Sequence, residues 1–385
     1  MQTSLAKFNH LLIYLILILV NVAYLPQIVE SSYYSIVTTV IIVLVVSCVL
    51  FNFFRYSGVI FTLIVPYVSV CLLVSSIVFF IYDEFIFTAV LNVILSIICF
   101  IVGYTVRNPS EDLINKCINI FIFSAIFMGL FSVYHILGRF EISIGYAFLA
   151  KNSSGVILGT GAVLSLYKLI VSRTLNYKLI YSISFFVSLV CLITFRCRSA
   201  MVALILIICV VMYKNRHSLF KILRNPMAFI SVLALFFCIF YFNIISFDYI
   251  YSSFFENKDV SDLNSVSSGR LDLYQIGLSS FYKDFVFGNI SIGANLPTLD
   301  NYIINVLSRY GFVGGLLLFP IYFYLWVICF RGLKRVPFIK VYPFLCLLLL
   351  LIVSLFESTY PFGPGTPVIC AFYLLGIHFK KICYL

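Results

Sequence analysis

Three arginines stand at two points of this sequence where their side-chain chemistry is informative. Arg196 and Arg198 flank Cys197 between two apolar runs, and Arg270 follows a polar, serine-rich stretch. A guanidinium is always charged and pairs with two phosphate oxygens, so arginines can hold a phosphate group and stabilise its charge without a metal ion. Arg196 and Arg198 could instead snorkel to a membrane surface. Arg270 lies in the first turn of an expected helix, where the dipole disfavours a cation, so a purely structural role is less attractive there.

Asp300 is the carboxylate that we expect to act with these arginines. In a partly desolvated site it could accept the proton of an attacking hydroxyl. It could equally be the N-cap of the helical run that it opens. Both alternatives stay open from the sequence.

The composition indicates which elements must position these residues. The chain has 385 residues, of which 63% are hydrophobic and 10% are charged, and its mean hydropathy is +1.12. A soluble domain carries about a quarter charged residues, because its surface faces water. Runs of about 20 apolar residues indicate that this surface faces lipid instead. We therefore expect an all-α, polytopic integral membrane protein with a single transmembrane domain over residues 1–385.

Apolar runs bounded by charged or turn-forming clusters predict about twelve transmembrane helices. Their approximate ranges are 10–26, 33–53, 59–81, 86–106, 117–137, 147–167, 179–195, 199–213, 226–244, 311–330, 341–356 and 366–379. The first follows Lys7 and has no clear cleavage site, so we interpret it as an uncleaved signal anchor. The connection at residues 196–199 could be a tight outer turn or a break inside the membrane.

The basic residues are distributed unevenly between the two sides of these spans. With the N-terminus inside, 17 of the 25 basic residues and only two of the 14 acidic residues lie on the cytoplasmic side. Basic loops resist translocation, so both termini are expected in the cytoplasm. The net charge of +11 is then an insertion signal, and the expected partner is the lipid bilayer, with no nucleic acid. Scattered cysteines and histidines give no reason to propose a disulfide, a metal or a cofactor.

One large outer loop is predicted over about residues 245–310, and it is expected to carry short amphipathic helices. Apolar residues recur in it at spacings of three and four, as on one face of a helix. They are Leu271, Tyr274, Leu278, Phe281 and Phe285. This helix could lie on the membrane or against the bundle, and Ser267 or Ser268 could cap its start. Further on, Gly311 leads into the next span, where small residues permit close helix packing.

Short motifs follow one another in a fixed order around this loop. They are Arg196-Cys197-Arg198-Ser199-Ala200, Ser268-Gly269-Arg270, Phe287-Gly288, Leu299-Asp300-Asn301-Tyr302 and Arg309-Tyr310-Gly311-Phe312-Val313-Gly314. Their order, and their predicted position on the outer side of the membrane, resemble the pattern of the superfamily of O-antigen polymerases (the Wzy type) and O-antigen ligases. The resemblance is best over roughly residues 150–320, and the first five helices match in hydropathy alone.

The resemblance implies a metal-independent glycosyltransferase at the periplasmic face of the bacterial inner membrane. Its substrates are oligosaccharides linked to undecaprenyl pyrophosphate, and a polymerase moves the growing glycan onto a new lipid-linked repeat unit. Arg196, Arg198, Arg270 and Asp300 are then the catalytic candidates. A protein that regulates chain length is a candidate partner for such a polymerase, although no residue here indicates one.

Other outer-side residues are candidates for substrate binding. Lys151 and Asn152 lie before Gly155, where a second lipid phosphate could dock, although an interfacial lysine is common without any function. Asn301 could orient sugar hydroxyls or only finish a turn. Glu357 could line the same cavity from the outer end of the eleventh predicted span.

Two other functions remain open alongside the polymerase. Ligases of the superfamily usually carry a histidine just before the asparagine, where this sequence has Asp300, and its outer loop contains no histidine, which favours a polymerase. A flippase for lipid-linked oligosaccharides would share the substrate. A transporter is expected to show related halves and small outer loops, and we find no clear internal repeat.

Overall fold

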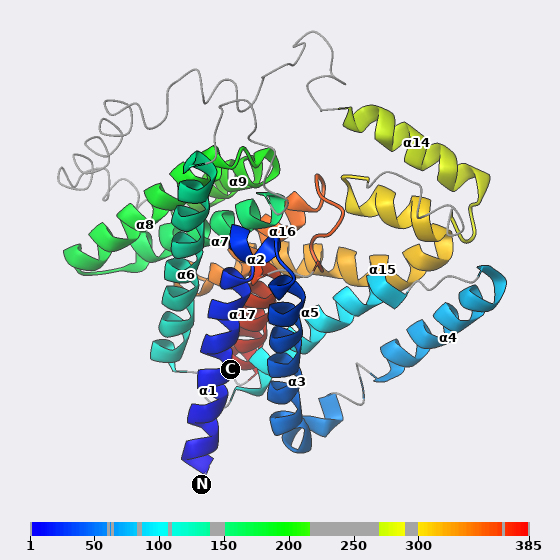
Figure 1. Cartoon of the computed structure of the whole chain (residues 1–385). Coiled ribbons are helices and arrows are strands. Elements are labelled where there is room, and N and C mark those ends of the chain that lie inside the picture. The colour runs from blue at the N-terminus through cyan, green and yellow to red at the C-terminus, as the bar shows by residue number, and fades with distance from the viewer. Residues whose placement is uncertain are drawn as a thin grey trace.

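The computed structural model describes residues 2–59, 62, 65–82, 87–106, 110–138, 151–215, 269–288, 299–363 and 366–383. Every regular element within these ranges is a helix, which confirms the all-α class for this part of the chain (Figure 1). The predicted span 226–244 and much of the predicted outer loop, including Ser267 and Ser268, lie outside the described residues.

Each predicted span within the described ranges overlaps one of the observed helices. The helices are α1 (Gln2–Val22), α2 (Pro26–Val29), α3 (Tyr33–Val59), α4 (Val65–Tyr82), α5 (Phe87–Thr105), α6 (Glu111–Gly138), α7 (Lys151–Val171), α8 (Leu175–Thr194), α9 (Arg198–Lys214), α14 (Arg270–Lys283), α15 (Tyr302–Arg335), η3 (Phe338–Lys340), α16 (Tyr342–Val353) and α17 (Thr366–Cys383). The main difference in extent is α15, which begins nine residues before the predicted span 311–330. A tight turn separates α8 from α9 at residues 195–197.

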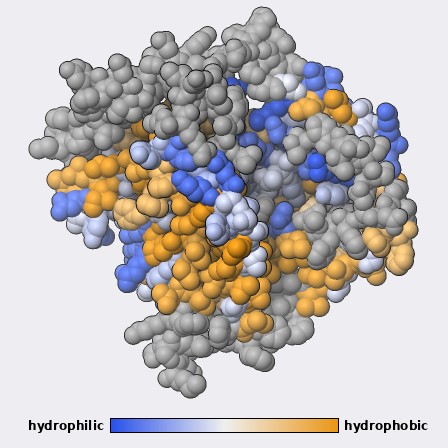
Figure 2. Space-filling model, viewed as in Figure 1, coloured by the Kyte–Doolittle hydropathy of each residue, from blue (hydrophilic) through white to orange (hydrophobic). Residues whose placement is uncertain are grey.

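Four helices in the described part of the chain are long and apolar enough to cross a membrane. They are α7, α8, α15 and the greater part of α6, and six shorter apolar helices accompany them. Large apolar side chains also point outward, such as Phe80 at 87% exposure and Leu316 at 58%. Figure 2 shows apolar residues over much of the middle of one face. Such exposure is unusual on a protein surrounded by water, so the fold has the helices and the surface of a membrane protein.

The core of the molecule lies around α16 and α17. Every residue of α16 is buried, and this helix packs against α7, α9, α15 and α17. A helix that is apolar on all sides belongs in such a central position. α17 packs most extensively against α5, and Figure 1 shows it near the middle of the bundle.

Helix α14 lies against the start of α15 at one edge of the molecule (Figure 1). Gly277 faces α15, where an added Cβ would lie 2.7 Å from a methyl carbon of Leu299. Of the predicted apolar stripe, Leu271, Leu278 and Phe285 are exposed. The helix therefore packs against the bundle through small residues and keeps part of its apolar stripe on the outside.

Gly311 produces a sharp change of direction within α15. Its φ of 59° and ψ of −156° interrupt the helix, so the N–H of Phe312 donates to the carbonyl of Phe285 at 2.9 Å. Gly288 also has a positive φ of 65°, and a Cβ on Gly311 would lie 2.4 Å from its backbone nitrogen. Both positions require glycine, because each has a positive φ and the two backbones lie in contact. This glycine joint (Gly288 and Gly311) fixes the end of α14 to α15, which is a more specific role than the helix packing that we expected.

Candidate functional site

Four helices begin at the same place in the fold. α7 begins at Lys151, α9 at Arg198, α14 at Arg270 and α15 at Tyr302. The first N–H groups of a helix have no partner within it, and its dipole is positive at that end. Such N-termini favour anions. In α15 the N–H groups of Tyr302 and Ile304 are already bonded to Ser354 and Asn301, so the starts of α7, α9 and α14 are the ones suited to a negatively charged group.

Arg270 joins two carboxylates at this place. Its Nε donates to Oδ2 of Asp300 at 3.0 Å, and its Nη2 lies 3.6 Å from Oε1 of Glu357. Tyr274, one turn further along α14, donates its hydroxyl hydrogen to the backbone carbonyl of Asp300 at 3.0 Å. Three of the residues predicted from the sequence are therefore held in contact, although they come from three separate segments.

Glu357 lies in the turn that follows α16, and only 8% of it is exposed. The hydroxyl of Ser199 donates to its Oε1 at 3.4 Å. Burial, and after it the charge of Asp300, raises the pKa of Glu357 to about 7, while Arg270 and hydrogen bonds from Ser199 and Asn152 act in the opposite direction. Burial disfavours the charged carboxylate because it removes water from it. Glu357 is therefore a carboxyl group that gains and loses its proton near neutral pH.

The turn between α8 and α9 holds Arg196 and Arg198. Arg196 has a positive φ of 51° and is 92% buried, a backbone conformation that non-glycine residues rarely adopt. Strain of this kind persists where the surrounding structure requires it, and functional sites are a common place for it. Arg198 is the first residue of α9, and it interacts electrostatically with Lys151, as Arg196 and Glu357 also do.

α7 lies close to this turn at Gly155. A Cβ added there would lie 2.4 Å from Sγ of Cys197, so only glycine leaves room for the turn. The thiol of Cys197 also donates to the backbone carbonyl of Asn152 at 3.7 Å. The start of α7 thus packs against the turn that carries the two arginines.

Asn301, and not Asp300, is the N-cap of α15. Its Oδ1 accepts from the N–H of Ile304 at 3.1 Å, as expected of an N-cap, and its Nδ2 donates to the carbonyl of Leu355 at 3.0 Å. The capping alternative considered for Asp300 is therefore wrong. Both groups of the Asn301 amide are engaged within the chain, so this geometry favours a structural role for Asn301 over contact with a substrate.

The residues predicted to form the site gather in one polar cluster, whose members come from five separate segments of the chain. The cluster consists of Lys151, Asn152, Arg196, Arg198, Arg270, Asp300, Asn301 and Glu357. Four basic side chains and two carboxylates belong to it, and Arg270 and Lys151 are the basic residues that interact with the carboxylates. Together with the helix N-termini, this excess of positive charge can bind an anionic group, and a buried carboxyl beside it can exchange a proton.

Two residues that bond to Glu357 and Asp300 were not predicted to belong to the site: Ser199 donates to the carboxylate of Glu357, and Tyr274 donates to the backbone carbonyl of Asp300. Ser199 directly follows Arg198, and Tyr274 lies one turn after Arg270 on the same helix. Proximity to the arginines was the available signal for both. The sequence assigns Ser199 to the motif at residues 196–200 and Tyr274 to an apolar stripe, and because neither is charged, neither was predicted to act in the site.

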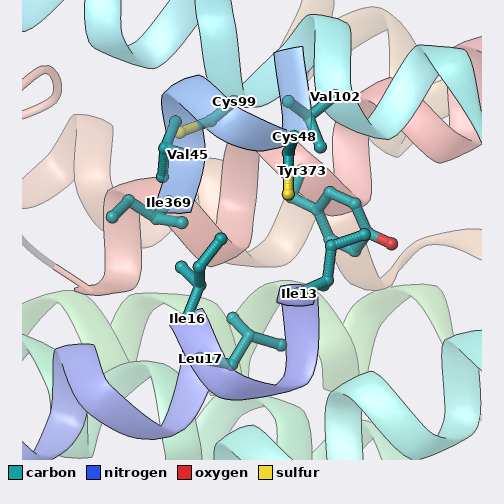
Figure 3. Close-up of a pocket in the computed structure, with 9 residues that line it drawn as sticks. All are labelled: Ile13, Ile16, Leu17, Val45, Cys48, Cys99, Val102, Ile369 and Tyr373. Atoms are coloured by element: carbon teal, nitrogen blue, oxygen red, sulfur yellow. The ribbon is translucent and has the colours of Figure 1, made fainter. Parts of the chain in front are cut away.

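A separate apolar cavity lies between α1, α3, α5 and α17 (Figure 3). Its volume is about 20 Å³, about the space of one water molecule, and Ile13, Val45, Cys99 and Ile369 are among its lining residues. No member of the polar cluster lines it. The cavity therefore belongs to the packing of the helices and is not part of the candidate site.

Comparisons with models of known protein families and with curated proteins find no match for this chain. The fold and the cluster define a helical membrane protein with a cationic site at the meeting point of four helix N-termini. Its function is inferred below from the residues of that site.

Proposed function

We propose that this protein is a polysaccharide polymerase of the bacterial inner membrane. It transfers a glycan from undecaprenyl pyrophosphate onto a new lipid-linked repeat unit at the periplasmic face. The observation that carries the proposal is the gathering of Arg270 and Lys151 around Glu357 and Asp300, with Arg196 and Arg198 in the adjoining turn at the start of α9. A lipid-linked pyrophosphate is an anion that lies at a membrane surface, and this arrangement offers the charge that it needs.

The proposed topology has about twelve membrane-spanning helices, cytoplasmic termini and a large periplasmic loop over residues 245–310. The residues at the two ends of α7, α9 and α15 support this topology. α7, α9 and α15 begin at the polar cluster, and their other ends also meet, where Lys214 donates to the carbonyl of Val336 at 2.6 Å. Lys168, Lys214, Lys334 and Arg335 lie toward those other ends. In the proposed topology 17 of the 25 basic residues and only two of the 14 acidic residues share the side of those other ends, which is then cytoplasmic, and the polar cluster is periplasmic.

The proposed reaction replaces one bond at the anomeric carbon of the donor glycan by another. The acceptor hydroxyl oxygen attacks that carbon while the bond to the pyrophosphate oxygen breaks. Undecaprenyl pyrophosphate leaves with the electron pair, and the arginines stabilise its charge. The proton of the acceptor hydroxyl passes to a carboxylate of the cluster, for which the sequence suggested Asp300.

A gel of surface polysaccharide from a deletion strain tests this proposal. The strain is complemented with wild-type protein, with Arg270→Ala, or with Lys283→Ala as a matched control at the exposed far end of α14. We expect the deletion to reduce the ladder to core plus one repeat unit, and wild type and Lys283→Ala to restore it. Free lipid-linked polymer in the deletion strain would indicate a ligase. An intact ladder in the uncomplemented strain would contradict a role in building that polymer.

A further inference from the structure

We propose, resting on the polymerase function above, that Glu357 and not Asp300 takes the proton from the acceptor hydroxyl, and that Asp300 positions Arg270. Glu357 is then the general base of the reaction. Asp300 is a positioning residue that acts through the guanidinium. The assignment departs from the one that the sequence suggested, and four features of the cluster support it.

The first feature is the contact between Asp300 and Arg270. Oδ2 of Asp300 accepts a charge-assisted hydrogen bond of 3.0 Å from Nε, and the backbone carbonyl of Asp300 accepts from Tyr274. Asn301, the next residue, is fixed as the N-cap of α15. Asp300 is thus held at both its side chain and its backbone, which suits a residue that orients a guanidinium.

The second feature is the looser contact made by Glu357. Its Oε1 lies 3.6 Å from Nη2 of Arg270 and 3.4 Å from Oγ of Ser199. Both distances exceed the 2.7–3.2 Å that is usual for strong hydrogen bonds. Asn152 also donates a hydrogen bond to Glu357. A carboxylate offers about four lone-pair positions, so with three donors around it Glu357 retains the capacity to accept one more hydrogen bond, from a substrate hydroxyl.

The third feature is the position of Glu357 relative to the cationic groups. It lies beside the start of α9 through Ser199 and beside α14 through Arg270. A pyrophosphate bound by the arginines and the helix N-termini would therefore lie next to this carboxylate. The acceptor hydroxyl must approach the anomeric carbon attached to that pyrophosphate, which brings the hydroxyl proton within reach of Glu357.

The fourth feature is the charge environment of Glu357. The titratable or charged groups that face it are Lys151, Cys197, Arg270, Tyr274, Asp300 and Tyr360. Burial and the charge of Asp300 raise the pKa of Glu357 to about 7, against the effect of Arg270. A general base works best when its pKa lies near the pH at which it acts, because it is then both ionised and basic.

The step is balanced in atoms and charge. The hydroxyl oxygen forms a bond to the anomeric carbon and loses its proton to the ionised Glu357. The bond from the anomeric carbon to the pyrophosphate breaks, and its electron pair leaves with the lipid. Protonated Glu357 then returns its proton to water, which the raised pKa allows near neutral pH.

The test uses full-length protein in lipid vesicles and the lipid-linked repeat unit extracted from the deletion strain. Initial rates of polymer formation are measured from pH 5.5 to pH 8.5 for wild type, Glu357→Gln, Glu357→Asp and Asp300→Asn. We expect the wild-type kcat to rise with pH through about 7, because the active form of Glu357 is ionised. Glu357→Gln should lower kcat by about 100-fold or more and remove that rise. Glu357→Asp should retain a rise at lower pH.

Asp300→Asn should lower activity and keep a rise with pH, shifted to lower pH because the charge of Asp300 helps to raise the pKa of Glu357. Binding of undecaprenyl pyrophosphate separates the roles further, since Glu357→Gln should retain it and Asp300→Asn should weaken it through the loss of Arg270 orientation. A wild-type kcat in Glu357→Gln, or loss of the pH-dependent rise in Asp300→Asn alone, would overturn the assignment. If wild-type protein forms no polymer at any pH, the proposed function itself fails, which is a distinct result. If Glu357→Gln does not fold, the profiles of Glu357→Asp and Asp300→Asn decide.

Discussion

Arg270 donates from its Nε to Oδ2 of Asp300 at 3.0 Å, across a separation of 30 residues in the sequence. This contact joins the first turn of α14 to the residue that precedes the N-cap of α15. The cation lies at the unfavourable positive end of a helix, and two carboxylates offset its charge there. A position that opposes the dipole in this way is expected of a functional arginine rather than of a surface one.

Replacement of Arg270 by lysine should lower activity nearly as much as replacement by alanine. A lysine carries the charge but lacks the planar fork that reaches both carboxylates and pairs with phosphate. We expect either change to lower kcat by about 100-fold, and to change the free energy of unfolding by less than about 1 kcal/mol, since the pair is partly exposed. Polymer formation and thermal unfolding of the same preparations check this. Substantial activity in Arg270→Lys would mean that charge alone suffices.

Gly155→Ala should disturb the turn that carries Arg196 and Arg198. The new Cβ would lie 2.4 Å from Sγ of Cys197, so the turn would have to shift. Gly161→Ala on the same helix is the matched control, because its nearest new contact is an ordinary 3.4 Å. Activity should fall strongly in the first variant and stay near wild type in the second. Equal activity in both would show that the position of this turn does not matter.

The glycine joint should be essential for the packing of α14 on α15. Gly311→Ala introduces both a positive-φ alanine and a contact of 2.4 Å with the backbone of Gly288. Gly269→Ala introduces a positive-φ alanine with nothing within 4 Å. Strain alone amounts to about 1–2 kcal/mol, so Gly311→Ala should lower the unfolding temperature clearly more than Gly269→Ala. Similar losses in the two variants would contradict the account of the joint.

The stability of the protein should depend on pH through Glu357. The folded-state pKa of about 7 exceeds the ordinary value of 4.5, so between these values the folded state holds a proton that the unfolded chain has released. Stability from this group is therefore complete below about pH 4.5 and is lost as the pH rises through about 7. Unfolding temperatures of wild type and Glu357→Gln across this range should converge at low pH and separate at high pH, with the glutamine variant the more stable. A constant difference would argue against the raised pKa.

The side of the membrane that the cluster faces can be measured with single cysteines. Ser279→Cys on α14 and Lys334→Cys at the far end of α15 both place a thiol at an exposed position. A membrane-impermeant maleimide added to intact spheroplasts should label the first and not the second, after subtraction of the wild-type background. The opposite pattern would reverse the proposed topology.

The sequence predicted the helices well and their meeting point only in part. Apolar runs locate each helix because the length of a span and the cost of burying charge are local properties. The contact between Ser199 and Glu357 joins residues 158 positions apart, and no local pattern encodes it. The sequence nevertheless indicated Arg270 and Asp300, through their chemistry and the short motifs of the outer loop, and Glu357, through its position at the end of an apolar run.

Other features depend on geometry that the sequence leaves undetermined. Asp300 and Asn301 are both good N-caps, and only the backbone of α15 decides that Asn301 takes that role. From the sequence, Gly311 is interpreted as a helix-packing residue, because small residues in membrane helices usually allow close packing. Its positive φ, and its contact with Gly288, require knowledge of where the end of α14 lies.

The most direct test of the central proposal is the release of undecaprenyl pyrophosphate by purified protein in lipid vesicles. The substrate is the lipid-linked repeat unit from the deletion strain, and both the polymer and the freed lipid are quantified. The account predicts one undecaprenyl pyrophosphate released for each bond formed between repeat units, and release about 100-fold slower with Arg270→Ala. Movement of intact lipid-linked repeat units across the vesicle membrane, without release of the lipid, would contradict it and identify a transporter.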